Sequence, residues 1–449
     1  MKKIVVALSL MLGVGGVFSQ NYNLEEVGYL NLTSIHSTGG SDIWGWVDSE
    51  GNEYAIVGLN NGTSIVDVTD PANPIEVFFE PGMNSLWRDI KTWNNHAYVT
   101  TEAKQGLLII DLSTLPSNPN LITTLWNPTT PTTDGNDLSA HNLYIDENGF
   151  CYLFGANIGD KGAFILDLNS DPKNPTEAGI INGDYVHDGV AKNNTLFTAN
   201  IGVGVIAMWN VSDKSNPILL GVKDTPNKKS HNIWFSDDLN YVYTTDEVSG
   251  AFLTEYDVTD PTDITETDRI RTTTGTDVIP HNTHFINDFI VTSYYRDGVI
   301  VHDVSDKGNM VEVARYDTSP AFSGSGFNGC WGVYPWLPSC NIIASDMENG
   351  LYILQPDASL NVCGTLDTNK HLKNPYSIYP NPATDEIRIG GAVNANHTLS
   401  VYNILGELVL EKDLSYYKIN IPSSLEEGIY LVKVSDGDKI VLTSKLLKK

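Results

Sequence analysis

The stretch GTSIVDVTDPANPIEVFFEPG, Gly62 to Gly82, combines a glycine, an apolar run, an aspartate, a turn rich in Asp, Pro and Asn, and a second apolar run. β-branched residues favour strands, and the turn residues favour a tight reversal, so the stretch predicts a β-hairpin. The same pattern recurs in stretches that begin at Gly106, Gly162, Gly204, Gly250 and Gly298. The hairpin is therefore one part of a repeat.

The polar residue before each turn gives the length of the repeat. It is Asp67 in the first copy, and the later copies carry Asp111, Asp167, Asn210, Asp257 and Asp303, in steps of 44, 56, 43, 47 and 46 residues. We expect these side chains to accept backbone N–H groups of the turn. A repeat of about 40 to 50 residues with four short strands per copy is typical of a β-propeller.

A seventh copy, GLYILQPDASLN from Gly350, stops before its last strand. The segment NLEEVGYLNL, Asn23 to Leu32, has the character of that missing strand. Because a closed ring leaves no open sheet edge, we expect this segment to complete the seventh blade. The sequence thus predicts an all-β fold, with a seven-bladed β-propeller over residues 20–361 that is closed by its N-terminal strand.

The N-terminus MKKIVVALSLMLGVGGVFSQ has two lysines, a short apolar run and a small residue near a cleavage position, so residues 1–19 are predicted to be a signal peptide. The apolar run is shorter than the roughly 20 residues of a membrane-spanning helix, and we expect no such helix in the mature protein. The net charge of −28, from 55 acidic and 27 basic residues, argues against a nucleic-acid partner and favours the attraction of cations.

The SIVDVTDPANP type of repeat resembles the LVIVD-repeat proteins, and the chain from about Asn21 to Asn361 resembles the choice-of-anchor B family of exported propellers. The resemblance implies the fold and a cell-surface setting. It implies no reaction, so it carries no catalytic residue to this chain.

The repeat ends after residue 361. Residues 362–374 are predicted to be a linker, and the short alternating strands of residues 375–449 indicate a small β-sandwich. This module resembles the type A C-terminal sorting domain of the type IX secretion system, through YPNPATDEI (Tyr379–Ile387), VYNILGELV (Val401–Val409), GIYLVKV (Gly428–Val434) and the basic end Lys445–Lys449. The resemblance implies the type IX machinery as a partner, and a location at the outer-membrane surface or outside the cell.

A functional site is expected on one face of the propeller. The first strand of each blade runs down the central channel and the second returns, so the start of the first and the end of the second lie on the same face. When the copies are aligned, blades three to six each place a histidine at this mouth. The predicted ligand-binding residues are Arg88, Glu102, His141, His187, His231, Asp246, Glu247, His281 and Asp346.

Two functions are compatible with this mouth. The first is a binding module for a glycan, a peptide or a small molecule. The second is a metal-assisted hydrolase or lyase, with His141, His187, His231 and His281 as metal ligands. Imidazole with carboxylate suits zinc or manganese, and oxygen ligands suit calcium. The sequence has no G-x-S-x-G or H-E-x-x-H motif, which favours the binding module.

Neighbouring positions have structural interpretations. Asn142, Asp188, Asn232 and Asn282 are expected to bond between blades. Arg88 is expected to clamp an anionic group of a ligand, or to pair with Asp89 or Glu102.

Alignment also predicts the roles of two further histidines and one cysteine pair. His284 and His302 fall in positions that are aromatic or apolar in other copies, which indicates packing between blades for His284 and core packing for His302. Cys330 and Cys340 lie at opposite ends of one hairpin and are too far apart to bond. If a disulfide forms, we expect it between Cys340 and Cys363, because both should lie near the lower face of the propeller.

Overall fold

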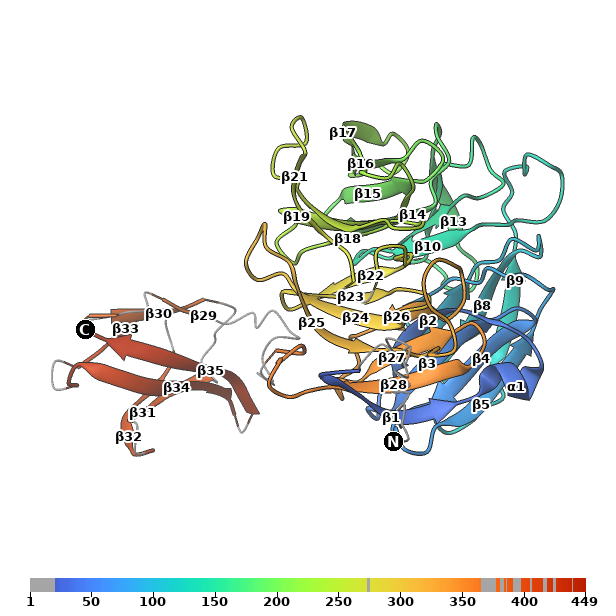
Figure 1. Ribbon diagram of the computed structural model, residues 1–449. Helices are drawn as coiled ribbons and strands as arrows, with labels where there is room; N and C mark the ends of the chain where they lie inside the picture. Colours follow the sequence, from blue (N-terminus) through green and yellow to red (C-terminus); the bar gives the residue numbers. More distant parts are fainter. Residues whose placement is uncertain are drawn as a thin grey trace, which may run out of the picture. The chain divides into compact units, whose positions relative to one another are not determined.

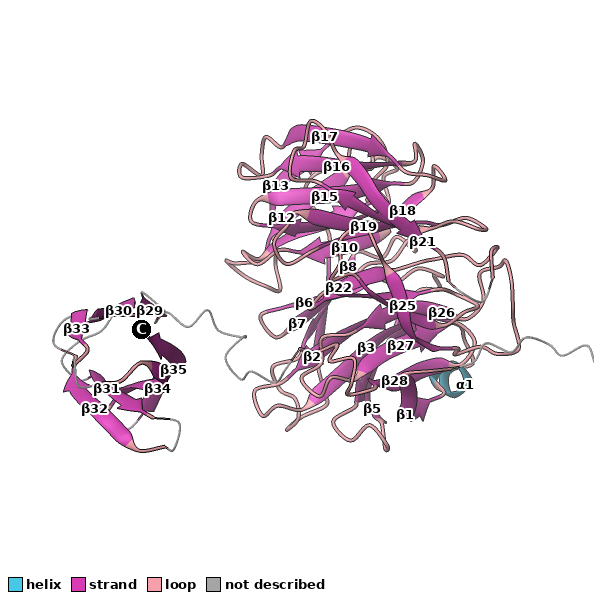
Figure 2. Cartoon of the chain, turned by 60° about the vertical axis from the view of Figure 1, so that its left-hand side comes forward, coloured by secondary structure: helices cyan, strands magenta, loops and turns pink. Residues whose placement is uncertain are grey.

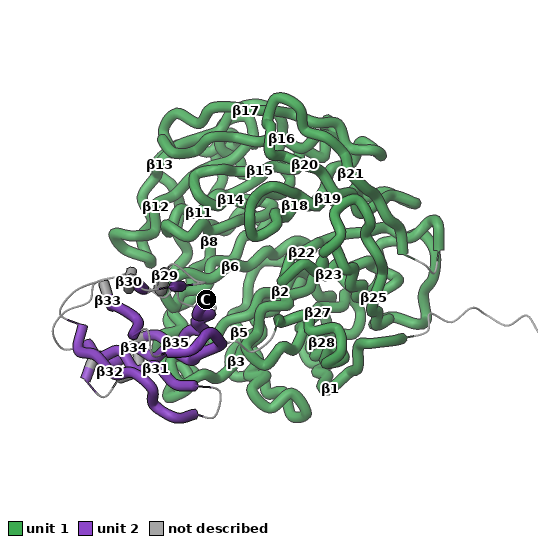
Figure 3. Tube along the Cα trace, turned by 90° about the vertical axis from the view of Figure 1, so that its left-hand side faces the viewer, with its two compact units in different colours: residues 1–364 green, residues 365–449 purple. Residues whose placement is uncertain are grey.

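The computed structural model describes residues 21–449 except 273–274, 365–376, 380–382, 385, 391–396, 404–405, 415–417, 423–424 and 438. The proposed signal peptide lies outside the described residues, and so does the proposed linker from residue 365 onward. The chain divides into two compact units, residues 1–364 and 365–449 (Figure 3).

Unit 1 contains seven four-stranded antiparallel sheets, which are the blades of the propeller (Figures 1 and 2). The innermost strands are β2 (Gly40–Val47), β6 (Ile90–Trp93), β10 (Asn142–Ile145), β14 (Asp188–Lys192), β18 (Ser230–Phe235), β22 (Thr283–Ile286) and β26 (Cys330–Tyr334). The second strands are β3 (Glu53–Leu59), β7 (His96–Val99), β11 (Phe150–Phe154), β15 (Thr195–Asn200), β19 (Tyr241–Asp246), β23 (Phe289–Ser293) and β27 (Ile342–Asp346). The third strands are β4 (Gly62–Asp67), β8 (Leu107–Asp111), β12 (Ala163–Asp167), β16 (Val205–Asn210), β20 (Leu253–Asp257), β24 (Val299–Asp303) and β28 (Gly350–Pro356). The outermost strands are β5 (Ile75–Pro81), β9 (Ile122–Trp126), β13 (Thr176–Ile181), β17 (Ile218–Asp224), β21 (Thr265–Ile270), β25 (Val311–Tyr316) and β1 (Leu24–Leu30).

The blades close into a ring. Each innermost strand contacts the innermost strands of both neighbouring blades, including β2 with β26. The N-terminal strand β1 pairs antiparallel with β28, from Leu24 opposite Pro356 to Leu30 opposite Leu351 (Figure 1). The predicted seven blades and the closure by the N-terminal strand are both confirmed.

Burial falls from the inside of each blade to the outside. Every residue of β3 is buried, whereas the outermost strand β21, with the sequence TETDRI, alternates between exposed and half-buried positions. Apolar side chains of neighbouring blades form common core clusters, which include Ile65 with Ile110 in one cluster and Ala55 with Ile353 in another. A strand covered on both faces is apolar throughout, and a strand with one wet face alternates. The short helix α1 (Leu32–His36) follows β1.

The turn after each third strand is held by the polar residue that marks the repeat. Asp67 Oδ1 accepts the backbone N–H of Thr69 at 2.9 Å, and Asp303 Oδ1 accepts that of Ser305 at 2.9 Å. The same bond to the residue two positions on forms at Asp111, Asp167, Asn210 and Asp257. The predicted role of these residues is confirmed.

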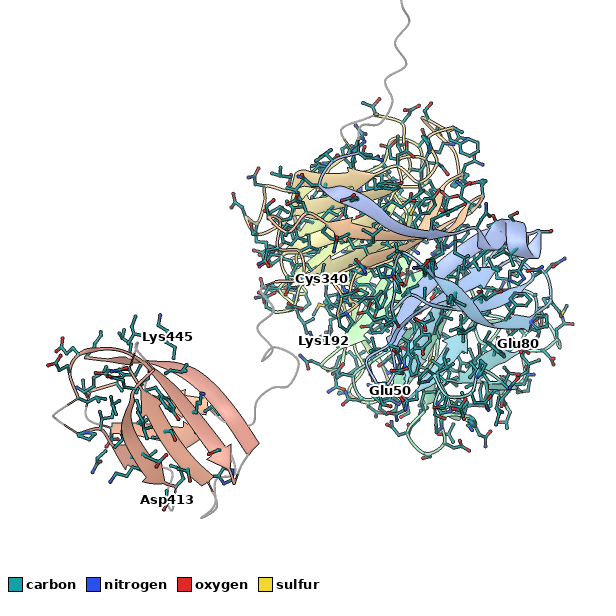
Figure 4. The ribbon with its side chains drawn as sticks, turned by 90° about the horizontal axis from the view of Figure 1, so that it is seen from below. Glu50, Glu80, Lys192, Cys340, Asp413 and Lys445 are labelled. Carbon is teal, nitrogen blue, oxygen red and sulfur yellow. A yellow bond between two sulfur atoms is a disulfide. The ribbon has the colours of Figure 1, made fainter. Side chains whose placement is uncertain are left out.

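A disulfide joins Cys340 to Cys363, with 5.7 Å between their Cα atoms, as predicted. It ties the turn between β26 and β27 to the chain that follows β28. Figure 4 labels Cys340 together with Glu50 and Lys192, which lie in or beside the corresponding turns of the first and fourth blades. Cys151 and Cys330 are buried free thiols.

Unit 2 has two antiparallel sheets. One contains β29 (Ser377–Tyr379), β30 (Glu386–Gly390) and β33 (Lys418–Asn420), and the other contains β31 (His397–Tyr402), β32 (Leu408–Asp413), β34 (Gly428–Asp436) and β35 (Lys439–Lys448). Buried residues of both sheets, such as Ile387 and Val432, form one core cluster. The predicted small β-sandwich is confirmed.

Candidate functional site

Side chains from the innermost strands fill the central channel in three layers. Residues two apart on a strand face the same side, so one strand supplies Asp42 to one layer and Trp44 to the next. The mouth layer consists of His141, His187, His231, His281 and Trp331. The middle layer consists of Asp42, Asp89, Asn142, Asp188, Asn232 and Asn282. The lower layer consists of Trp44, Lys91, Tyr144, Trp234, His284, Tyr334 and Trp336.

A β-bulge explains how two successive residues both enter the channel. Ser230 pairs with Asp246 and Asn232 pairs with Thr245, so His231 is an extra residue without a partner of its own on β19. β26 has the same irregularity at Trp331. A bulge changes the direction of the following side chains. His231 and Asn232 therefore occupy adjacent layers of the channel instead of opposite faces of the blade.

The four histidines of the mouth layer lie side by side. The distance between ring centroids is 4.0 Å from His141 to His187, 4.2 Å from His187 to His231 and 4.4 Å from His231 to His281. Tyr295 lies 4.5 Å beyond His281. Four consecutive blades thus contribute one arc of imidazole rings, in the order that the sequence alignment predicts.

The backbone of the next blade orients these rings. Nδ1 of His187 lies 3.1 Å from the carbonyl oxygen of His231, and Nδ1 of His281 is hydrogen-bonded to the carbonyl oxygen of Trp331. A carbonyl oxygen only accepts, so each Nδ1 carries the proton and each Nε2 presents a lone pair. The carbonyl of His281 takes the corresponding place beside His231 and partly opposes the lowering of its pKa, although Nδ1 of His231 makes no hydrogen bond of ordinary geometry among the described residues.

Burial keeps the imidazoles neutral. Desolvation, with the neighbouring imidazoles adding to it, lowers the pKa of His187 and of His231 well below the usual value. Desolvation also lowers the pKa of His281 to about 3. At neutral pH these three rings are uncharged, which is the form of imidazole that accepts a hydrogen bond or binds a metal ion.

One carboxylate reaches these lone pairs. Glu247 follows β19, and its Oε1 lies 3.8 Å from Nε2 of His231 and 3.8 Å from Nε2 of His281. The Tyr295 hydroxyl donates to the same oxygen at 2.7 Å. Burial raises the pKa of Glu247, and the hydrogen bond from Tyr295 opposes this rise. The cavity above the middle layer has a volume of about 20 Å³, which is room for one water molecule or one ion.

Glu102 contacts His141 at the other end of the arc of imidazole rings. Its Oε1 lies 2.8 Å from Nδ1 of His141, and its side chain is 40% exposed. Glu102 and His141 therefore form a pair at the rim, separate from Glu247.

Two predicted ligand-binding residues are used for folding. The carboxylate of Asp246 accepts the hydroxyl of Thr225 and the backbone N–H groups of Asn227 and Lys229, at 2.6 to 2.9 Å. The carboxylate of Asp346 likewise accepts four hydrogen bonds. Two come from hydroxyl groups in the loop before β26, and two come from backbone N–H groups directly after β27. Both residues end a second strand and hold the loop between blades, so their oxygens are already occupied.

Arg88 also differs from its expected role. Its Nε donates to the Leu59 carbonyl at 2.8 Å, and its Nη2 donates to the Met83 carbonyl. The side chain is 1% exposed, and its burial lowers the pKa to about 10. Arg88 pairs with neither Asp89 nor Glu102 among the described contacts. The guanidinium holds the loop after β5, and Arg88 also lines the cavity that the histidines line.

The middle layer is a network between blades. The Asn232 amide donates to the Asp188 carboxylate, and the Asn282 amide donates to Asp42 at 3.3 Å. Asn232 Oδ1 accepts the N–H of Thr283 in the next blade at 2.8 Å. These contacts fit the expected structural role of Asn232, Asn282 and Asp188. The expected bond of Asn142 stays a prediction, because its Oδ1 is buried without a partner among the described residues. The sequence interpretation missed Lys91, which lies 2.6 Å from Asp89 and supplies the positive charge of this network.

The contacts of His284 agree with its predicted packing between blades. Its ring lies 4.6 Å from Trp234 of the fifth blade and 5.1 Å from Trp336 of the seventh blade. His302 is fully buried within its blade, as expected. The sequence interpretation also missed Trp87, which lines the cavity at the mouth.

The lower layer could have been predicted from alternation along the strands. Lys91 lies two residues after Asp89, so both side chains face the channel.

Comparison with known proteins agrees with this architecture. The family model described as the LVIVD repeat matches residues 50–79, 87–125 and 296–318. The model described as the secretion system C-terminal sorting domain matches residues 377–449. The chain is an exported β-propeller repeat protein. More particularly, it carries LVIVD repeats and a C-terminal sorting domain of the type IX secretion system, which directs it to the cell surface or the extracellular space.

Solved structures are similar in fold only. The WD40 repeats of RRP9 match with a TM-score of 0.51 and 11% identity, over 74% of this chain and 97% of that chain. U3-55K matches with a TM-score of 0.51 and 10% identity, over 74% and 98%. PorZ, a surface component of the type-IX secretion system of Porphyromonas gingivalis, matches with a TM-score of 0.46 and 12% identity, over 89% of this chain and 58% of that chain, so this chain covers less than two thirds of PorZ.

No curated protein has a significant sequence match to the chain. Within the described residues, no helix has the length and apolar character needed to cross a membrane.

Proposed function

We propose that the protein is a binding module displayed at the cell surface, and that it recognises a glycan at the mouth of the central channel. One observation carries the proposal: neutral polar groups converge at the mouth and are surrounded by aromatic side chains. Trp87 and Trp331 line the same cavity as the histidines. Tyr185 lies 6.2 Å from His187, and Phe327 lies 5.4 Å from Tyr295.

This combination suits a sugar. A pyranose has an apolar face that stacks on aromatic rings and hydroxyl groups that need hydrogen-bonding partners. The Trp87 side chain is 37% exposed and Phe327 is 54% exposed, so both are accessible for stacking. The Nε2 lone pair of the neutral His187 accepts a hydroxyl hydrogen. A protein with a net charge of −28 repels anionic ligands, which favours neutral sugars among glycans.

Affinity electrophoresis tests the proposal. The full chain is run in native gels that contain a neutral soluble polysaccharide, such as xylan, galactomannan or laminarin. We expect at least one of them to retard the protein, and Trp87→Ala to abolish the retardation. Tyr29→Ala is the matched control, because Tyr29 is equally exposed, at 37%, on the outermost strand β1. Mobility that no polysaccharide changes, or equal retardation of the Trp87→Ala variant, would refute the glycan proposal and leave a peptide or another small ligand.

A metal-assisted hydrolase or lyase is the second candidate. It is favoured by the convergence of His231, His281 and Glu247, since three protein ligands with open positions are typical of hydrolytic metal sites. Hydrolysis of p-nitrophenyl esters and phosphates by the full chain, with and without added zinc, is the assay. Zinc-dependent turnover that Glu247→Gln abolishes supports this candidate, and the absence of turnover under both conditions argues against it.

A further inference from the structure

We propose that Nε2 of His231, Nε2 of His281 and Oε1 of Glu247 bind one divalent transition-metal ion of the zinc type. The inference deepens the proposed function, because it rests on the same mouth of the channel. The sequence analysis predicted four histidines as metal ligands. The inference retains two of them, His231 and His281, adds Glu247, and leaves His141 at the rim.

Geometry is the first argument. The three atoms lie within 4.8 Å of one another, and the two distances that involve Glu247 are 3.8 Å. Zinc binds nitrogen and carboxylate oxygen at about 2.0 to 2.2 Å, so two ligand atoms of a tetrahedral ion lie about 3.4 Å apart. The two distances to Glu247 exceed this separation by about 0.4 Å. The two Nε2 atoms need a closing movement of at most about 1.4 Å, which small rotations of the side chains supply.

Electrostatics is the second argument. Because Nδ1 of His281 donates to a backbone carbonyl, its Nε2 lone pair points toward the carboxylate of Glu247. The separation of 3.8 Å is too long for a hydrogen bond. Lone pairs and a carboxylate that face one another without a proton between them repel. A cation in the gap converts this repulsion into three favourable bonds.

The surroundings are those of a prepared site. His231 is 3% exposed and His281 is 2% exposed, so neither ring can turn outward to water. The Tyr295 hydroxyl fixes the ligating oxygen of Glu247, and the Trp331 carbonyl fixes the His281 ring. Such outer partners orient metal ligands and set their basicity.

The backbone adds a further sign of a functional position. Tyr295 adopts φ 41°, in the left-handed region that a bulky residue rarely occupies. Residues held in such conformations concentrate at binding and catalytic sites.

The ligand set selects the type of metal. Two imidazoles with one carboxylate suit zinc and its neighbours, whereas calcium and magnesium take oxygen ligands. Three protein ligands leave at least one position of a tetrahedral ion open toward the mouth. A hydroxyl pair of a sugar, or water, fits that position.

Calorimetric titration of zinc into the chelator-treated full chain tests the inference. We expect one ion per chain. Loss of a direct ligand in Glu247→Gln or His281→Ala should weaken binding at least about 100-fold, because even outer partners are worth about 10- to 100-fold. Glu102→Gln is the matched control, since it changes a carboxylate at the same mouth outside the trio, and its affinity should stay within about threefold of wild type. Tryptophan fluorescence confirms that each variant is folded.

Other outcomes overturn the inference. These are no zinc binding by the folded wild type, or equal affinity of the wild type and the folded Glu247→Gln variant. The polysaccharide gel, run with a chelator, separates this failure from failure of the proposed function. Retardation that depends on Trp87 but not on metal would refute the metal site and leave the glycan site standing.

Discussion

His302 makes the propeller sensitive to acid. The ring lies on β24 and is fully buried, and neither of its nitrogens has a hydrogen-bond partner within the part of the chain that the structure describes. Burial lowers its pKa to about 4, with the Glu312 carboxylate opposing this shift and the Arg315 guanidinium adding to it. Tyr294 is a further titratable neighbour, with 6.3 Å between the ring centroids. We predict that His302→Leu reduces the loss of stability in acid.

The sign and the size follow from the shift. The unfolded chain binds a proton on this histidine near pH 6.5, and the folded chain does so only near pH 4. The unfolded state therefore binds more protons between these values, and stability falls as the pH decreases from 6.5 to 4. Each pH unit is worth about 1.4 kcal/mol, so the wild type loses about 3 kcal/mol through His302 over this range. Leucine occupies the equivalent buried position, Leu166, in the third blade.

Urea unfolding followed by tryptophan fluorescence measures the effect. All nine tryptophans lie between residues 44 and 336, so the signal reports the propeller alone. The difference in unfolding free energy between His302→Leu and wild type should rise by about 3 kcal/mol in favour of the variant between pH 7 and pH 4. Contributions of groups that do not interact with His302 cancel in this difference. A difference that does not change with pH would show that the burial argument for His302 is wrong.

Four further predictions concern the rest of the chain. Asp246→Ala should lower the unfolding free energy by about 3 kcal/mol in urea at pH 7, because three hydrogen bonds to a buried carboxylate are lost; an unchanged midpoint would contradict its role in the loop. Deletion of residues 21–31 should open the last blade and make residues 350–356 accessible to proteases, whereas unchanged resistance would show that β1 does not hold the ring closed. Alkylation of the unreduced, denatured protein should label two thiols and spare Cys340 and Cys363; four labelled thiols in mass spectrometry would contradict the disulfide. Removal of residues 377–449 should retain the propeller inside the cell envelope of a type IX-competent bacterium, and its appearance in the medium would contradict sorting by this module.

Much of the fold was predictable because each blade carries its own local signal. The side chains of Asp67 and its equivalents accept the backbone N–H of the residue two positions on. The repeat therefore predicts hairpins from local sequence alone. The predicted arc of histidines depended on the alignment of first strands. The structure brings His141 to His281 together in the order expected from the alignment, while the bulge at His231 has no plain sequence signal.

The individual roles of mouth residues were less predictable. Asp246 and Glu247 are adjacent, yet one ends the strand under a loop and the other faces the histidines. This difference depends on the residue at which the strand pairing of β19 ends. A repeat pattern in the sequence does not define that residue to better than one position. The Arg88 side chain is long enough to turn back to a loop carbonyl, and no pattern in the sequence specifies its direction.

An anomalous difference map at the zinc edge, from crystals of the full chain soaked in zinc, tests the functional mouth most directly. A single strong peak about 2.1 Å from each of His231 Nε2, His281 Nε2 and Glu247 Oε1 is the predicted result. A map with no peak at the channel mouth, or with zinc bound only at other carboxylates of this acidic surface, would contradict it.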